Sequence, residues 1–277
     1  MSRDGLDRRV AVLGFPGSNC EVETQRALLA AGVKADIVRW NESPDRLSHY
    51  GGFVLPGGFS YQDRVRAGAL AAKETIVEAV TAGAEEGKPI LGICNGCQIL
   101  VEAGLVPGIR EGDVEMALAP NHRPGGAGYY CRWVFLKHVA SPGRCLLTRL
   151  LGQSEVLPIP IAHAEGRFVT SSNDLVATLR ENDQVVLRYC DAHGRVSSSP
   201  DVNPNGSVDD IAGLCNPRGN VLALMPHPER AAWLRQVPEG METLWATDRS
   251  GAAGRGQDLE NEGPGRRLFE AFGWEQG

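Results

Sequence analysis

Short apolar runs alternate with helix-like segments from residue 10 to about Gly104. The apolar runs predict strands at 10–15, 35–38, 52–55 and 90–93. The segments between them predict helices at 21–31 and 65–86, and a further helix follows Cys94. Because alternating strands and helices are typical of βαβ units, this part of the chain is predicted to form a doubly wound parallel sheet.

The pattern changes beyond Gly104, where strands are predicted at 130–136, 156–162, 184–189 and 221–225. This half is predicted to be a mixed or antiparallel extension of the sheet, and residues 1–277 to form a single α/β domain. Residues 235–264 are poor in large apolar side chains and rich in glycine and charge. They are predicted to form a surface excursion before a closing helix at 267–272.

Composition places the chain among globular proteins of a reducing compartment. Hydrophobic residues make up 42% and charged residues 22% of the 277 residues, and no apolar run is long enough to cross a bilayer. The segment before residue 10 lacks the apolar core of a signal peptide, so we expect a cytoplasmic protein without a membrane partner. The net charge of −6 offers no basic footprint for nucleic acid. The seven scattered cysteines favour free thiols, with Cys20 expected to be a small core residue or a bystander.

The segment Leu91-Gly-Ile-Cys-Asn-Gly-Cys-Gln-Ile99 places Cys94 in a turn between a predicted strand and a predicted helix. Glycines on both sides, Gly92 and Gly96, allow the tight turn of a nucleophile elbow with sulfur in place of the usual serine oxygen. A thiol at a helix N-terminus is favoured as the thiolate by free amides and by the helix dipole. Cys94 is therefore predicted to be a nucleophile.

The segment Leu222-Ala-Leu-Met-Pro-His-Pro-Glu229 supplies a base for that nucleophile. Its two prolines are expected to hold the chain extended after a strand, so that His227 and Glu229 project to the same side. A carboxylate beside an imidazole fixes its tautomer and supports its protonated form. His227 is predicted to be the general base for Cys94, with Glu229 as its orienting partner.

A third strand runs into glycines at Val54-Leu-Pro-Gly-Gly-Phe-Ser-Tyr61. An amide from Gly57 or Gly58, together with the amide of Asn95, is predicted to form an oxyanion hole. Three strand ends would then meet at one crevice, where open α/β sheets bind their ligands.

These segments resemble the class I (triad) glutamine amidotransferases, and within them the glutaminase subunits of phosphoribosylformylglycinamidine synthase. The nucleophile, GG and PHPE segments are typical of the superfamily, whereas GFPGSN at 14–19, HAEGR at 163–167 and NPNGS at 203–207 are typical of this subunit. The resemblance covers most of the chain up to about Arg230. It implies a flavodoxin-like sheet and a Cys-His-Glu triad formed by Cys94, His227 and Glu229.

The resemblance also implies the residues around the substrate. Gln98 matches a position that helps to hold glutamine, Gly57 belongs to the same substrate-binding turn, and Gly58 matches an oxyanion-hole glycine. The chain departs from the family pattern at Gln62 and Ala164, where the family usually has glycine. These two departures are expected to affect glutamine affinity and the local path of the backbone, but not the residues of the triad.

No complete nucleotide-binding motif is present: residues 83–89 fall one residue short of a P-loop, and no GxGxxG sequence occurs. Ammonia from a glutaminase would then be used by another polypeptide. The resemblance implies a large synthetase subunit that binds ATP and magnesium, and a small third subunit in many bacteria. It predicts that this chain hydrolyses glutamine through a γ-glutamyl thioester and supplies ammonia for the conversion of formylglycinamide ribonucleotide, without a cofactor or metal of its own.

Other interpretations compete with this one. Cys94 and Cys97 form a CxxC that could bind zinc or act in redox chemistry, although no second pair or HxxxH partner accompanies it. A DJ-1-type cysteine hydrolase shares the elbow but usually has histidine where this chain has Asn95. A noncatalytic binding module and a different triad amidotransferase are further alternatives. His163 and Glu165 repeat the spacing of the proposed base and its partner, and could lie in the site, at a subunit interface, or in a purely structural role.

Overall fold

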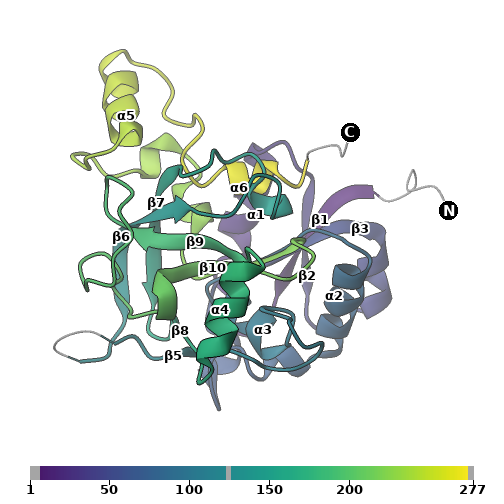
Figure 1. Cartoon of the computed structure of the whole chain (residues 1–277). Coiled ribbons are helices and arrows are strands. Elements are labelled where there is room, and N and C mark those ends of the chain that lie inside the picture. Colours follow the sequence, from purple (N-terminus) through teal and green to yellow (C-terminus); the bar gives the residue numbers. More distant parts are fainter. Residues whose placement is uncertain (1–6, 123–125, 274–277) are drawn as a thin grey trace.

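The structure is a computed structural model that describes residues 7–122 and 126–273, and its centre is a mixed sheet (Figure 1). Nine strands form this sheet: β1 (Asp7–Gly14), β2 (Ala35–Arg39), β3 (Tyr50–Leu55), β4 (Ile90–Ile93), β6 (Tyr130–His138), β7 (Val156–His163), β9 (Val185–Cys190), β10 (Ile211–Cys215) and β11 (Val221–Leu224). Their order is β2-β1-β3-β4-β11-β10-β9-β6-β7. β5 (Ala117–Ala119) and β8 (Arg167–Val169) form a separate antiparallel pair.

The α-helices are α1 (Glu21–Ala30), α2 (Thr75–Glu85), α3 (Asn95–Glu102), α4 (Asn173–Glu181), α5 (Leu244–Gly254) and α6 (Arg267–Glu270). Short 3₁₀ helices occupy Pro44–His49, Ser60–Asp63, Ala71–Lys73, Leu146–Thr148, Val208–Asp210, Pro228–Ala231 and Leu234–Gln236.

The parallel half of the sheet confirms the doubly wound prediction. β2, β1, β3, β4 and β11 pair in parallel, and every residue of β4 is buried. The chain moves outward from β1 to β2 through α1 and in the opposite direction from β3 to β4 through α2. Because such crossovers are right-handed, the two helices cover opposite faces of the sheet. The carboxyl ends of β3, β4 and β11 therefore meet at one edge.

The other half is antiparallel, as the sequence predicted. β10 pairs antiparallel with β11 and β9, and β6 pairs antiparallel with β9 and β7. The predicted strand boundaries in this half differ from the observed ones by two residues or fewer. β10 and α4 were not predicted, because β10 is a short, wholly buried run and α4 is a short amphipathic helix among turn residues.

The predicted helix at 65–86 is wrong over 65–74, nearly half of its length. The regular helix, α2, begins only at Thr75, after irregular chain and a single 3₁₀ turn at Ala71–Lys73. Gly68 adopts φ +80°, and a Cβ there would come within 2.7 Å of the Gln98 backbone. This close approach requires glycine in a left-handed conformation, which ends any helix.

The predicted surface excursion at 235–264 contains a helix that was not foreseen. Figure 1 shows α5 projecting from the body of the molecule beyond the β6–β7 edge. The Thr243 side chain caps it by accepting a hydrogen bond from the Ala246 amide at 3.1 Å. Leu244, at the start of α5, is 81% exposed, so the helix buries little apolar area.

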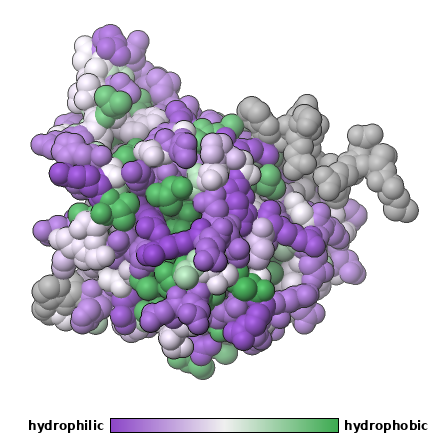
Figure 2. All heavy atoms as spheres, in the orientation of Figure 1, coloured by the Kyte–Doolittle hydropathy of each residue, from purple (hydrophilic) through white to green (hydrophobic). Residues whose placement is uncertain are grey.

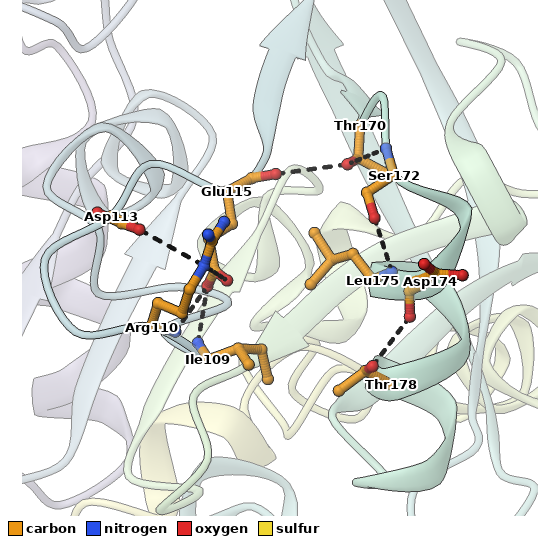
Figure 3. A network of polar contacts seen from close by, with 9 residues as sticks. All are labelled: Ile109, Arg110, Asp113, Glu115, Thr170, Ser172, Asp174, Leu175 and Thr178. Carbon is orange, nitrogen blue, oxygen red and sulfur yellow. Dashed lines mark hydrogen bonds and ion pairs between the residues drawn. The ribbon is translucent and has the colours of Figure 1, made fainter.

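Polar contacts tie the loop after α3 to the start of α4 (Figure 3). Glu115 accepts a hydrogen bond from the Ile109 amide at 2.8 Å, and its own carbonyl accepts one from Thr170 at 3.4 Å. The Ser172 side chain then caps α4 through the Leu175 amide. These contacts join the loop after α3 to the end of β8 and the start of α4.

The surface seen in Figure 2 is mixed, with small hydrophobic groups separated by hydrophilic side chains. None of the described helices is long and apolar enough to span a bilayer.

Candidate active site

Cys94 stands between β4 and α3 in the strained conformation of a nucleophile elbow. Its dihedral angles are φ 51° and ψ −104°, a combination that non-glycine residues rarely adopt. The Cys94 amide donates to the Leu224 carbonyl at 2.8 Å, and its own carbonyl accepts from the Gln98 amide at 3.1 Å. These bonds hold the side chain at the edge of the sheet, between two neighbouring parallel strands.

The glycines on each side of Cys94 are required by close packing. A Cβ on Gly96 would lie 1.9 Å from the Leu55 carbonyl oxygen, and one on Gly92 would lie 2.7 Å from the Gly96 carbonyl oxygen. α3 can therefore approach β3 and β4 only because neither position carries a side chain. The predicted reason for both glycines is confirmed.

The structure brings His227 and Glu229 together, although not by the predicted extended segment. Pro228–Ala231 is a 3₁₀ turn, because the Pro228 ring is well suited to the first position of a helix. His227 Nδ1 nevertheless lies 2.6 Å from Glu229 Oε1. The His227 amide also donates to the Pro160 carbonyl at 2.8 Å, which anchors His227 to β7.

The electrostatics of this pair suit a proton acceptor. The His227 and Glu229 side chains are 2% and 0% exposed. Burial opposes protonation of the ring, but the charge of Glu229 and the nearby Cys94 sulfur outweigh it and hold the pKa of His227 well above its usual value. Since the carboxylate accepts the Nδ1 proton, Nε2 is the nitrogen that gains or loses the titrating proton, and the raised pKa means that it holds this proton readily. This buried atom has no hydrogen-bond partner among the described residues.

The turn after β3 lies against the same ring. A Cβ on Gly57 would come within 2.7 Å of His227 Cε1, so any side chain there would displace the imidazole ring. Gly58 has φ +153°, and a Cβ there would lie 2.6 Å from Ser18 Cα. Among the residues that the structure describes, the Gly58 and Asn95 amides donate no hydrogen bond. Both are therefore free to bind an oxyanion.

Gln98 and Asn95 are linked through their side chains to the turn after β3. Asn95 Oδ1 accepts from the Ser60 amide at 3.1 Å, and Asn95 Nδ2 donates to Gln98 Oε1 at 2.9 Å. Gln98 Nε2 then donates to the Glu165 carbonyl at 2.7 Å. The first turn of α3 thus connects the turn after β3 to the chain after β7.

His163 does not form a second histidine–carboxylate pair. Its Nδ1 donates to Asn121 Oδ1 at 3.0 Å, and the ring lies directly beneath Gly166, where a Cβ would be 2.1 Å away. Burial, with the His227 charge, lowers the pKa of His163 to about 3, so the ring stays neutral. Glu165 instead lies near Asp63, and burial together with this second carboxylate raises the pKa of Asp63 to about 6.

The two departures from the family pattern have different structural consequences. Gln62 has φ 60° and ψ 29°, a left-handed conformation that glycine adopts without strain and that costs another residue about 1–2 kcal/mol. Ala164 is only partly buried, and its carbonyl accepts from the Asn121 amide at 2.8 Å. Of these two positions, the strained one is Gln62, in the turn after β3.

Two residues beside the base were missed by sequence reasoning. Cys20 is buried as expected, but it is not a bystander: it lies against the His227 ring, and Arg230 Nη2 donates to its Sγ at 3.1 Å. Neither Cys20 nor Arg230 belongs to a sequence pattern that is typical of catalytic residues. The only signal was the presence of both within segments that resemble the family.

The CxxC interpretation gains no support. Cys97 is fully buried inside α3, and burial raises the pKa of its thiol well above the usual value. Within residues 7–122 and 126–273, neither Cys94 nor Cys97 joins a cluster of three metal-ligating side chains.

Comparison with known proteins decides the family. The model of the CobB/CobQ-like glutamine amidotransferase domain matches residues 7–270. The phosphoribosylformylglycinamidine synthase subunit PurQ of Methanothrix thermoacetophila is 45% identical over 95% of this chain and 96% of its own length. The chain belongs to the PurQ family of glutamine amidotransferases.

Further PurQ relatives agree. The PurQ subunit of Pyrococcus furiosus is 46% identical over 81% of this chain and 89% of its own. A chain in the structure of PurLQS from Thermotoga maritima is similar with a TM-score of 0.69 and 33% identity, covering 95% of this chain and 96% of that one. Membership of this family rules out the two alternatives that the chain is a DJ-1-type hydrolase or a noncatalytic binding module.

Proposed function

We propose that this chain is the glutaminase subunit of a phosphoribosylformylglycinamidine synthase. The observation that carries the proposal is the convergence of Cys94, the buried His227–Glu229 pair and two free amides at one sheet edge, in a chain of the PurQ family. A Cys-His-Glu arrangement with an oxyanion hole is suited to acyl transfer from an amide.

In the proposed reaction, Cys94 Sγ attacks the side-chain carbonyl carbon of glutamine while its proton passes to His227 Nε2. The Gly58 and Asn95 amides stabilise the oxyanion, and the His227 proton then passes to the leaving nitrogen, which departs as ammonia. His227 Nε2 then deprotonates a water molecule, which hydrolyses the γ-glutamyl thioester to glutamate. The proton passes from His227 to the Cys94 sulfur and restores the thiol. Gln98 and Gly57 shape the substrate pocket, and no metal or cofactor takes part.

The ammonia is used by a partner. The relatives are named as synthase subunits, and the similar chain from Thermotoga maritima is part of a structure named PurLQS. We propose that a large synthetase subunit carries ATP and magnesium, that a small third subunit completes the assembly, and that the complex is cytoplasmic.

Hydrolysis in the isolated chain is expected to be slow. The Cys94 sulfur is close enough to His227 to help raise the pKa of that ring, yet its thiol is directed to the Ala162 carbonyl oxygen at 3.7 Å, a weak hydrogen-bond acceptor. The turn from Gly58 to Gln62 contains left-handed residues that can rearrange when a partner docks. Synthetase binding is proposed to align the thiol with the base.

The test uses the reconstituted complex. Cys94→Ala should abolish glutamine-dependent synthesis and leave ammonia-dependent synthesis intact, because only the ammonia source is lost. Glutamate release should be measured from the chain alone and then with the synthetase, ATP and acceptor substrate. Residual glutaminase near wild type in Cys94→Ala would refute the nucleophile. Full activity alone, unchanged by the partner, would refute the activation step.

A further inference from the structure

Cys20 places a second sulfur in the active site, and the proposed reaction does not use it. The Cys20 Sγ, one ring nitrogen of His227 and one carboxylate oxygen of Glu229 all lie within 4.8 Å of one another. All three side chains are buried. Thiolate, imidazole and carboxylate are the ligands of protein Zn²⁺ sites, in which neighbouring donor atoms lie roughly 3.5 Å apart. Small side-chain shifts would bring this cluster to that spacing.

Two buried polar atoms of the cluster lack partners. His227 Nε2 and Glu229 Oε2 form no hydrogen bond with the described part of the chain. Buried polar atoms are nearly always satisfied in native proteins, so these two atoms are open to an added partner such as water, substrate or a metal ion. Of the residues described, only Cys20, His227 and Glu229 form a group of three with metal-ligand spacing.

We propose that Cys20, His227 and Glu229 form an inhibitory site for a thiophilic divalent cation, with Zn²⁺ as the best match. A neutral imidazole has one lone pair and one proton. When a metal ion takes the lone pair of either nitrogen, the other nitrogen keeps the proton, so the ring no longer accepts one from Cys94. Bound metal would therefore stop glutamine hydrolysis without touching the nucleophile.

Arg230 limits the affinity of this site. Its guanidinium donates to Cys20 Sγ at 3.1 Å, and its positive charge opposes a cation. The Arg230 side chain is 36% exposed, so it can turn toward solvent when the ion binds. Metal binding must also displace the thiol proton of Cys20, which makes the affinity pH-dependent. These features favour a reversible inhibitor over a permanent structural ion.

Binding is tested without any activity measurement. Co²⁺ is titrated into the full chain, followed by thiolate-to-cobalt absorption, and Zn²⁺ is then added as a competitor. Cys20→Ser should abolish the absorption, whereas Cys94→Ser and the exposed-thiol control Cys131→Ser should retain it. Serine suits position 20, because this residue is the N-cap of α1. Thermal unfolding checks the fold, and Cys20→Ala replaces the serine variant if that one is unstable.

The consequence for activity rests on the proposed function and is measured separately. In the complex with synthetase, Zn²⁺ should inhibit glutamine-dependent synthesis and spare ammonia-dependent synthesis. The rate of each complex is expressed relative to its own metal-free rate. Half inhibition of the Cys20→Ser complex should then need at least about tenfold more Zn²⁺ than half inhibition of the wild-type complex, because the variant lacks one metal ligand.

Cobalt absorption that persists in Cys20→Ser, or that is lost in Cys94→Ser, would overturn the site. Equal Zn²⁺ sensitivity of the Cys20→Ser and Cys131→Ser complexes would overturn its inhibitory role. A metal-free wild-type complex that does not hydrolyse glutamine would instead contradict the proposed function, and leaves the binding result standing.

Discussion

Replacing Glu229 by glutamine removes one negative charge from a fully buried pair. Glu229 Oε1 lies 2.6 Å from His227 Nδ1. Glutamine has nearly the same shape, and its amide oxygen can still accept the Nδ1 proton. The tautomer and the position of the ring should therefore survive, and the change isolates the effect of the charge on the protonated ring.

The size of that effect follows from the geometry. Two unit charges about 4 Å apart interact by about 4 kcal/mol at an effective dielectric constant of about 20. The amide dipole recovers part of this, so a net loss of about 2–4 kcal/mol is expected. Since about 1.4 kcal/mol corresponds to a factor of ten, acylation should slow by about 30-fold to 10³-fold. His227→Ala should be more damaging, because it removes the proton acceptor altogether.

Rapid-quench single-turnover kinetics on the synthetase complex measure this directly, through the first glutamate or ammonia released. Ammonia-dependent synthesis serves as the control for intact assembly. If Glu229→Gln were slower than His227→Ala, or within threefold of wild type, the assignment of Glu229 as the charged partner of the base would be refuted.

The same substitution should change how stability depends on pH. The pKa of His227 is raised in the folded state, so its contribution to stability is complete below its unfolded value near 6.5 and is lost as pH rises through the folded pKa. Denaturant unfolding should therefore show stability falling above about pH 6.5 in the wild type. The fall should be smaller in Glu229→Gln, and equal slopes would contradict the coupling.

Three further predictions follow from particular contacts. Gly57→Ala should lower glutamine-dependent synthesis at least about tenfold with ammonia-dependent synthesis unchanged, since its Cβ would stand 2.7 Å from His227 Cε1; wild-type activity would refute the contact. The pKa of His163 is lowered to about 3, so this residue should contribute up to about 5 kcal/mol of stability that is present above pH 6.5 and lost as pH falls toward 3. In denaturant unfolding, the stability of His163→Gln should depend less on pH over that range than the stability of the wild type. An unchanged pH dependence would contradict the prediction. Cys97→Ala should keep most glutaminase activity, and a loss as large as that of Cys94→Ala would revive the CxxC interpretation.

The local geometry around Cys94 was largely predictable because it depends on nearby residues in the chain. The glycines around Cys94 and the strand that precedes it act within a few residues, and the structure explains both glycines by contacts with β3 and α3. The pairing of His227 with Glu229 was predicted for a partly wrong reason, since a 3₁₀ turn rather than an extended segment joins them. The roles assigned to these residues stay predictions until measured.

What could not be predicted depends on contacts between distant segments. Cys20 is buried like any core cysteine, and only the folded chain brings it beside His227, more than two hundred residues away. The start of α2 was missed because Gly68 packs on the Gln98 backbone, a contact that no local pattern encodes. α5 was missed because it projects from the body and so lacks the apolar stripe by which helices are recognised.

Asn95 links the turn after β3 to Gln98, so the two should move together. Its Oδ1 accepts a hydrogen bond from the Ser60 amide, and its Nδ2 donates to Gln98 Oε1. Gln98 Nε2 in turn donates to the Glu165 carbonyl. A partner that moves the turn after β3 must therefore either break the Ser60 bond or pull on the Asn95 side chain. Because these groups are buried, breaking a bond without replacing it would cost about 1–3 kcal/mol. The turn and the glutamine pocket should consequently change together when the synthetase docks, and the first turn of α3 is the element through which they are coupled.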